Sequence, residues 1–314
     1  MSVVAERERA APEARPISRE RRAKRSPVRR LIRRGPFLLL VLIILVYVAF
    51  PFYWVVRSAF TPDGDLFRTP VQYFPTHPTL TNFREVLSTK DFQHALINST
   101  IVAGATTLIA LALGSLAGYA LGRFRFRGRS AALYLMLSMT IFPQIAILGA
   151  LYTIVSHHFH VFGFDYQMYD TLGALAFSYM VLVMPLTVWI LTTFMRALPR
   201  DLEEAAYVDG ATPLQVFYKV MLPLVAPGLV TAGLLAFITA WNEFLYAVSF
   251  IQSTDKYTVP LAIFNFTGKS GSTFEFPWGQ VMAATVIVTA PLIVLTLALQ
   301  RRILAGLTAG AVKG

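Results

Sequence analysis

The chain has 314 residues, of which 55% are hydrophobic and only 14% are charged, and its mean hydropathy is +0.57. Water-soluble domains carry roughly 25% charged residues, so this chain lacks the polar side chains needed to cover a soluble surface. Cysteine is absent, which excludes disulfides, thiolate metal sites and cysteine nucleophiles.

The net charge of +11 is concentrated at the N-terminus. Residues 1–35 hold 12 of the 28 basic residues and four acidic residues, a local net charge of +8. A basic segment directly before an apolar run is typical of a membrane-topology signal and not of a nucleic-acid site. We therefore predict no nucleic-acid partner, and we interpret residues 1–35 as a basic, disordered cytoplasmic tail.

Six apolar stretches follow the tail, and each is long enough to span a bilayer. A helix of about 20 residues crosses roughly 30 Å of hydrocarbon at 1.5 Å per residue. The stretches are 36–57, 94–122, 131–156, 171–195, 227–250 and 281–300. The predicted fold class is therefore an all-α membrane protein with six transmembrane helices. Residues 36–314 form the transmembrane domain, with a core at 94–305.

Lysine and arginine indicate the orientation of these helices. If the N-terminus lies inside, the cytoplasmic segments hold 22 basic residues and the rest of the chain holds six. These segments are 1–35, 123–130, 196–226 and 301–314. Because Lys and Arg concentrate in cytoplasmic loops, we predict that both termini are cytoplasmic.

Proline and glycine predict irregular positions within the spans. The third, fourth and sixth stretches each contain a proline, which removes a backbone donor and kinks its helix. These prolines are Pro143, Pro185 and Pro291. In the second stretch, Gly114, Gly118 and Gly122 recur every four residues, a spacing that lets another helix approach closely.

The segment between the fourth and fifth stretches is predicted to form two short helices joined by a sharp turn. Asp201 with Glu204, and Thr212 with Gln215, are each spaced as a capping box. Gly210 lies between them and is typical of a helix end. The second helix is expected to present one apolar face, made of Phe217, Val220, Met221 and Leu224.

This segment resembles the cytoplasmic EAA loop of bacterial ABC-importer permeases, whose pattern is EAA, three residues, G, nine residues and I-x-L-P. Here the matching residues are Glu204-Ala205-Ala206, Gly210 and Val220-Met221-Leu222-Pro223, with Val220 in place of Ile. Three further segments are similar to the sugar branch, and most similar to maltose/trehalose-type permease subunits. They are 117–128, 241–244 and 278–284. The resemblance covers residues 36–310.

The resemblance implies a permease subunit that moves a maltose- or trehalose-like oligosaccharide across the bacterial inner membrane by alternating access. It implies three partners besides membrane lipid: an ABC ATPase homodimer, a second, homologous permease subunit and an extracytoplasmic sugar-binding protein. ATP and Mg would be bound by the ATPase, so the chain itself needs no cofactor and is not an enzyme. The residues implied to couple to the ATPase are Glu204, Ala205, Ala206, Asp209, Gly210 and Ala211.

The sequence itself offers no convincing nucleotide or metal site. Gly268-Lys269-Ser270 resembles the end of a P-loop, but Ile263 stands where the first glycine is required. His157, His158 and His160 have ligand-type side chains. With Asp165 as the only nearby carboxylate, we favour a solvated loop and predict no metal.

Candidate substrate contacts lie in the third and fifth stretches: they are Gln144, Trp241, Asn242, Glu243 and Tyr246. Their aromatic, amide and carboxylate groups are of the kind that bind sugar hydroxyls. Glu243 is the only charged residue well inside a span, so it should face protein or water. A second interpretation stays open, in which the two aromatic residues form an interfacial belt and the polar residues satisfy helix ends or bond to a neighbouring helix.

Other functions remain as alternatives. An ABC permease for a polyol, glycerol phosphate or an oligopeptide would share most of these features. An ion-coupled secondary transporter would need paired ionisable residues in its spans, and only Glu243 is available. A membrane enzyme would need a convergent set of nucleophile, base or metal ligands, which the spans lack.

Overall fold

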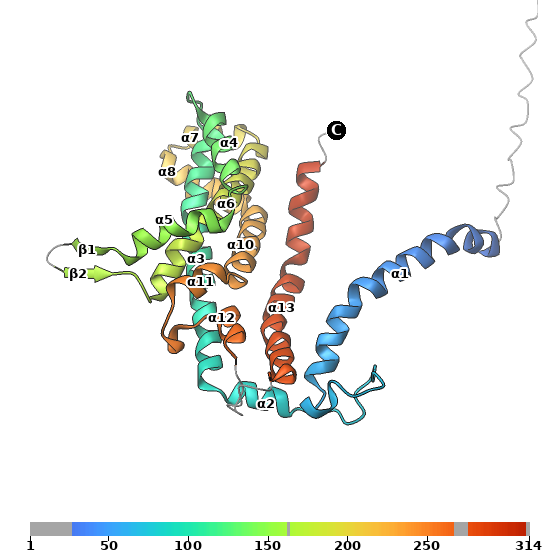
Figure 1. Ribbon diagram of the computed structural model, residues 1–314. Helices are drawn as coiled ribbons and strands as arrows, with labels where there is room; N and C mark the ends of the chain where they lie inside the picture. Colours follow the sequence, from blue (N-terminus) through green and yellow to red (C-terminus); the bar gives the residue numbers. More distant parts are fainter. Residues whose placement is uncertain (1–26, 162–163, 267–275, 312–314) are drawn as a thin grey trace, which may run out of the picture. The chain divides into compact units, whose positions relative to one another are not determined.

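The computed structural model describes residues 27–161, 164–266 and 276–311 (Figure 1). The chain divides into two compact units, Met1–Phe52 and Tyr53–Gly314. Helix α1 (Pro27–Ala59) carries the first apolar stretch and begins within the segment predicted as a tail. The first 26 residues of that tail, and Gly268-Lys269-Ser270, lie outside the described residues.

Helices make up most of the described part of the second unit. In chain order they are α2 (Thr81–Ser88), α3 (Lys90–Arg123), α4 (Arg129–Met139), α5 (Gln144–Ser156), α6 (Leu172–Ala197), α7 (Asp201–Val208), α8 (Pro213–Gln215), α9 (Leu222–Leu224), α10 (Ala226–Trp241), α11 (Leu245–Phe250), α12 (Val259–Phe264) and α13 (Trp278–Ala311). Strands β1 (His158–Val161) and β2 (Phe164–Gln167) form an antiparallel hairpin in which His158 pairs with Gln167.

The hairpin corrects the all-α prediction locally. Residues 158–161 alternate between polar and apolar side chains, which is the period of a strand and not of a helix. His158 and His160 lie on this strand, and the described residues contain no group of three potential metal ligands.

Between four and six membrane spans are present in the described residues. Four helices are long and apolar enough to cross a bilayer: they are Gly35–Ala59 of α1, α3, α6 and Trp278–Gln300 of α13. Two further pairs reach this length only if a bent pair is counted as one span. They are α4 with α5, bent by 98°, and Pro213–Leu224 with α10, bent by 76°.

The third and fifth apolar stretches are not the continuous helices that the sequence predicted. Pro143 does not kink a helix but directly precedes α5, after a turn that ends α4. In the fifth stretch, α10 ends at Trp241 and α11 begins three residues after Asn242. By contrast, Pro185 and Pro291 lie inside α6 and α13, which continue through them.

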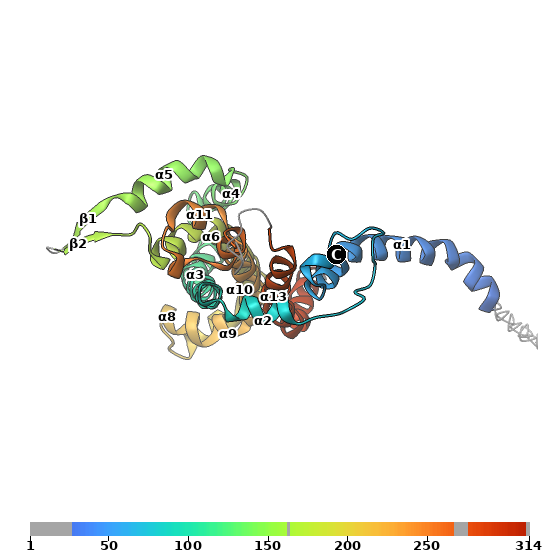
Figure 2. The same ribbon diagram turned by 60° about the horizontal axis from the view of Figure 1, so that its bottom comes forward.

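Helices α3 and α6 pack together along their length, and α10 lies against both (Figures 1 and 2). A Cβ atom added to Gly122 would lie only 2.8 Å from Cβ of Met195. A Cβ atom on Gly118 would lie 3.1 Å from the backbone nitrogen of Thr192. The close helix approach predicted from the glycine spacing is confirmed, and α6 is the partner.

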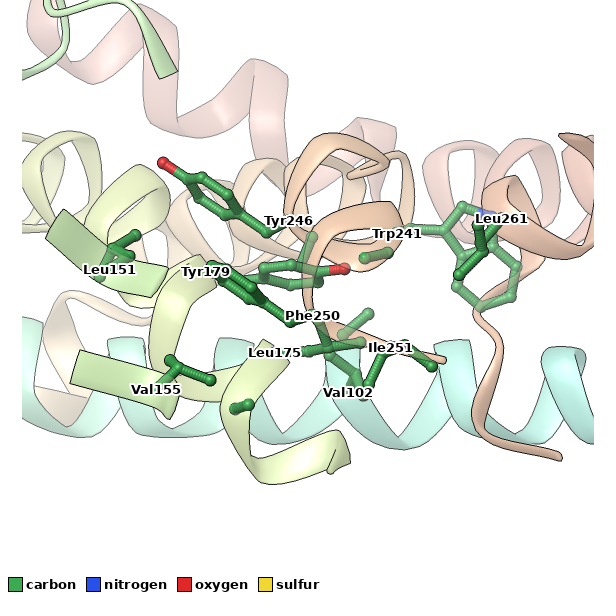
Figure 3. Close-up of a cluster of buried hydrophobic side chains, with 14 residues drawn as sticks. Val102, Leu151, Val155, Leu175, Tyr179, Trp241, Tyr246, Phe250, Ile251 and Leu261 are labelled. Carbon is green, nitrogen blue, oxygen red and sulfur yellow. The ribbon is translucent and has the colours of Figure 1, made fainter. Parts of the chain in front are cut away.

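The second unit has its largest buried cluster among α3, α5, α6, α10, α11 and α12 (Figure 3). The rings of Tyr246 and Phe250 stack there with their centroids 5.8 Å apart. Tyr179 of α6 is fully buried in the same cluster. Because lipid tails are as apolar as these side chains, the cluster stabilises the fold mainly by close packing.

Asp170 ties the start of α6 to the loop that follows α11. Its carboxylate accepts hydrogen bonds from the backbone N–H groups of Gln252 (2.9 Å) and Ser253 (3.0 Å) and from Nζ of Lys256 (2.9 Å). Burial alone would raise the pKa of this carboxyl. The hydrogen bonds from Ser253, Lys256 and Gln252 outweigh burial, and the pKa of Asp170 lies well below its usual range.

We expect Gly122→Ala to lower the stability of the purified protein by about 1–3 kcal/mol, because the added methyl group forces α3 and α6 apart. Gly104→Ala is the matched control on the same helix, since a Cβ there meets nothing within 4 Å. It should leave stability unchanged or raise it by up to about 1 kcal/mol through helix propensity. Thermal unfolding in detergent measures both, and equal losses would contradict the packing account.

We expect Asp170→Asn to destabilise the protein at neutral pH by on the order of 2 kcal/mol, because an amide cannot replace a carboxylate that accepts several bonds. A carboxyl whose pKa is lowered by folding stabilises the protein above its unfolded pKa of about 3.9, and this contribution is lost as pH falls towards the lower folded value. The unfolding midpoint of the wild type should thus fall more steeply than that of the variant below about pH 4. If the unfolding midpoints of the wild type and the variant fell in parallel with pH, Asp170 would not be the stabilising carboxylate.

Candidate functional site

Helix α7 carries the segment that resembles the EAA loop, and its N-terminal turn differs from the prediction. The N-cap is Arg200, and no side chain caps the helix. The predicted capping box of Asp201 with Glu204 is therefore wrong. Asp201 lies one residue inside the helix, so its charge stabilises the positive end of the helix dipole without capping it.

Gly210 makes the turn after α7. Its φ is +81°, a left-handed conformation that glycine adopts without steric cost. Its N–H donates to the carbonyl oxygen of Tyr207 (3.0 Å), and the N–H of Ala211 donates to that of Ala206 (3.0 Å). These bonds close the C-terminal end of α7, so the helix and its turn form one stiff unit.

The second helical segment begins as predicted and then departs from α geometry. Thr212 and Gln215 form the expected capping box, with bonds of 3.4 and 2.8 Å. Residues 216–221 are π-helical, which adds residues to each turn and shifts the buried face. Leu224 is consequently exposed, contrary to the prediction. The buried residues are Val216, Phe217, Met221 and Val225, which pack against Tyr119 of α3 and Met195 of α6.

Arg123, the last residue of α3, joins three elements at this end of the bundle. Its Nε donates to Oε1 of Glu203 on α7 at 2.6 Å. Its Nη1 donates to the carbonyl oxygens of Met195 (3.1 Å) and Leu198 (2.9 Å), and its Nη2 to that of Pro199 (3.2 Å). One side chain therefore fixes α7 to the ends of α3 and α6.

This ion pair is shielded from water on both sides. The side chains of Arg123 and Glu203 are only 5% and 14% exposed. The planar guanidinium offers five donors in a fixed arrangement, and here four contacts use them. In the sequence, Arg123 stands out only as one of the basic residues that indicate membrane orientation. Its ion pair with Glu203 could not be predicted, because no local pattern pairs residues that are 80 positions apart.

The remaining part of α7 faces outward. Four of the predicted coupling residues are exposed: Glu204, Ala205, Asp209 and Gly210. The other two, Ala206 and Ala211, are partly buried against the apolar cluster that contains Phe217 and Met221. The same segment exposes apolar side chains that the prediction did not include. They are Leu202, Tyr207, Val208 and Leu214, of which Val208 is 87% exposed. A grouping of exposed apolar residues is typical of a contact surface for another protein.

The predicted substrate residues of the fifth stretch lie at the break between α10 and α11. The carboxylate of Glu243 accepts hydrogen bonds from the backbone N–H groups of Tyr246 (2.8 Å) and Ala247 (3.2 Å). It is buried and satisfies the first turn of α11. Trp241 and Tyr246 are also buried, within the cluster of Figure 3.

Two of the predicted substrate residues are exposed. Asn242 lies in the break, where its Nδ2 donates to the carbonyl oxygen of Ile238 (2.8 Å). Gln144 is the first residue of α5, in the bent pair α4 and α5. Helix α5 packs against α11, so it lies beside the helix that follows the break at Asn242.

Comparison with known proteins gives a family match over most of the chain. The family model described as "Binding-protein-dependent transport system inner membrane component" matches residues 110–308. The trehalose transport system permease protein SugB of Mycobacterium tuberculosis is 40% identical, over 87% of this chain and 95% of that protein. The trehalose/maltose transport system permease protein MalG of Thermococcus litoralis is 38% identical, over 87% and 94%.

A solved structure shares the fold at low sequence identity. It is that of a bacterial ABC transporter involved in the import of the acidic polysaccharide alginate. The matched chain superposes with a TM-score of 0.72 at 19% identity, over 88% of this chain and 98% of that one. The arrangement of helices described above is therefore shared with a chain of that ABC transporter.

We expect Glu203→Gln to lower stability by about 1–3 kcal/mol, because it leaves the buried Arg123 without its counter-charge. Glu204→Gln is the matched control, since the neighbouring carboxylate is exposed, and its effect should stay within about 0.5 kcal/mol. The unfolding midpoints of the two variants in detergent test this difference. A loss in Glu204→Gln as large as that in Glu203→Gln would argue against the anchoring role.

Proposed function

The chain belongs to the inner membrane components of binding-protein-dependent transport systems, and we propose that it is the permease subunit through which an ABC importer moves a trehalose- or maltose-like oligosaccharide. The observation that carries the proposal is the stiff, outward-facing α7, which is joined to the ends of two long apolar helices through Arg123. The choice of sugar rests on the names of the two relatives at 40% and 38% identity.

Coupling to the motor is assigned to α7 and its turn. Glu204, Ala205 and Asp209 would contact a cleft of the ATPase, with Gly210 setting the direction of the chain after the helix. Ala206 and Ala211 would support this surface from below, where they pack against the apolar cluster. ATP and Mg would bind to the ATPase homodimer, and this chain would supply the surface that its movement displaces.

The proposed topology has six spans: the bent pair α4 and α5 counts as one, and the fifth span is 227–250, which follows the cytoplasmic segment 196–226. An even number of spans places both termini on one side, and the distribution of Lys and Arg favours the cytoplasm for that side. In this arrangement α7 is cytoplasmic, residues 1–35 form a cytoplasmic tail, and residues 36–314 form the permease domain with its core at 94–305. The location would be a bacterial inner membrane.

The substrate path is proposed to follow the bent pair α4 and α5 and the break between α10 and α11. Gln144 and Asn242 are exposed amides within otherwise apolar segments, and such groups are costly in contact with lipid. Facing a polar pathway or the second permease subunit removes this cost. Trp241, Glu243 and Tyr246 would shape the break that brings Asn242 to the path.

Two further partners complete the proposed assembly, besides lipid. A second, homologous permease subunit would close the pathway, and an extracytoplasmic sugar-binding protein would deliver the substrate, as the family description "binding-protein-dependent" suggests. Nucleic acid is not among the expected partners.

Transport by the reconstituted complex tests the proposal. Gly210→Pro should abolish trehalose uptake while ATP hydrolysis continues, because proline cannot adopt the +81° φ and the turn must reorganise. Gly104→Ala is the control, because a Cβ atom at this position of α3 has no neighbour within 4 Å, and it should retain both activities. Uptake by Gly210→Pro at the wild-type rate would refute the coupling assignment. Uptake of glycerol phosphate or an oligopeptide in preference to trehalose and maltose would refute the sugar assignment.

A further inference from the structure

An open cavity of about 520 Å³ lies where α4 begins and α6 ends. Three arginines line it, namely Arg125, Arg129 and Arg196, together with Phe126. The lining residues include no aspartate or glutamate. The volume is within the roughly 300–1,000 Å³ typical of small-molecule sites.

The three arginines are held at the cavity in different ways. Arg129 donates to the carbonyl oxygens of Phe124 (3.2 Å) and Gly122 (3.3 Å), and Arg196 donates to that of Leu121 (3.2 Å). Each of these guanidinium groups keeps further N–H donors, since an arginine has five. Arg125 is exposed on the loop between α3 and α4.

This grouping of like charges has an electrostatic cost that an anion would remove. Guanidinium groups repel one another, and the lining offers no carboxylate to balance them. The cluster differs from Arg123 nearby, which has Glu203 as its partner. The first turn of α4 also lies at this cavity, and the N-terminal end of a helix attracts negative charge. The cavity is therefore complementary to an anion with several acceptor oxygens.

The chemistry of the lining favours a phosphate group in particular. Guanidinium forks match the tetrahedral oxygens of phosphate with paired hydrogen bonds. Apolar side chains of α4, such as Tyr134 and Leu135, are exposed one to two turns beyond the cavity, where they would face hydrocarbon. Phe126 adds an apolar wall. A headgroup at the membrane surface would place its phosphate among the arginines and its acyl chains along α4.

We propose that Arg125, Arg129 and Arg196 form a site for a phosphate group, supplied by an anionic membrane lipid that binds between α4 and α6. The site lies at the same end of the bundle as α7 (Figure 1), next to the helix ends that Arg123 joins. A bound lipid would brace the start of α4 against the end of α6. This role does not depend on which solute is transported.

The test compares two neighbouring arginines in the full-length chain purified in neutral detergent. Arg125→Gln removes a charge from the cavity, whereas Arg127→Gln removes the same charge from the same loop outside the cavity lining. The unfolding midpoint is followed during titration with phosphatidylglycerol, with phosphatidylcholine and inorganic phosphate in separate arms. We expect phosphatidylglycerol alone to raise the midpoint saturably, with about fivefold more needed for Arg125→Gln and no change for Arg127→Gln.

The outcomes separate the source of the phosphate from the existence of the site. If inorganic phosphate raises the midpoint with the same dependence on Arg125, the site exists but takes a soluble phosphate, and the lipid assignment is overturned. If Arg125→Gln and Arg127→Gln titrate alike, the arginines act only as a diffuse positive surface and there is no site. A midpoint that responds equally to phosphatidylcholine would overturn the proposal in the same way.

Discussion

The structure depends on how Arg123 is satisfied. A buried guanidinium is tolerated only if its donors and its charge are matched, and here one carboxylate and three backbone carbonyls do so. The carbonyls belong to the end of α6 and the residues that follow it, and the carboxylate belongs to α7. The same contacts that remove the cost of burial therefore join a long span, its neighbour and an exposed helix into one body. Displacing α7 must either move the ends of α3 and α6 or break this network.

Close backbone packing extends that body into the membrane domain. The glycines of α3 let α6 approach so closely that a single methyl group would collide with it, which leaves little room for the two helices to slide. The breaks between α4 and α5 and between α10 and α11 contrast with this pair. At the second break, the carboxylate of Glu243 accepts hydrogen bonds from the first backbone N–H groups of α11. In the proposed function, the stiff pair would transmit displacement and the irregular segments would line the pathway.

Local features of this fold could be predicted from the sequence, and long-range ones could not. The capping box of Thr212 with Gln215 spans four residues and is confirmed, whereas the box at Asp201 is wrong because Arg200 takes the cap position. Proline marks irregular positions without saying which will break: α6 continues through Pro185, but α4 ends before Pro143, since neighbouring groups decide whether the freed carbonyl is satisfied. The candidate site shows the same contrast. The resemblance to the EAA loop identifies α7, whereas nothing in a single sequence pairs Arg123 with Glu203.

The central claim is that α7 receives movement from a separate motor subunit, and cross-linking at its most exposed residue tests this directly. The natural chain has no cysteine, so Val208→Cys introduces a single reactive thiol at a side chain that is 87% exposed. In the assembled, transport-competent complex, a short thiol–amine cross-linker should join this introduced thiol to the ATPase. If the variant complex transports sugar and the thiol forms no cross-link to the ATPase, α7 is not the coupling element and the account is wrong.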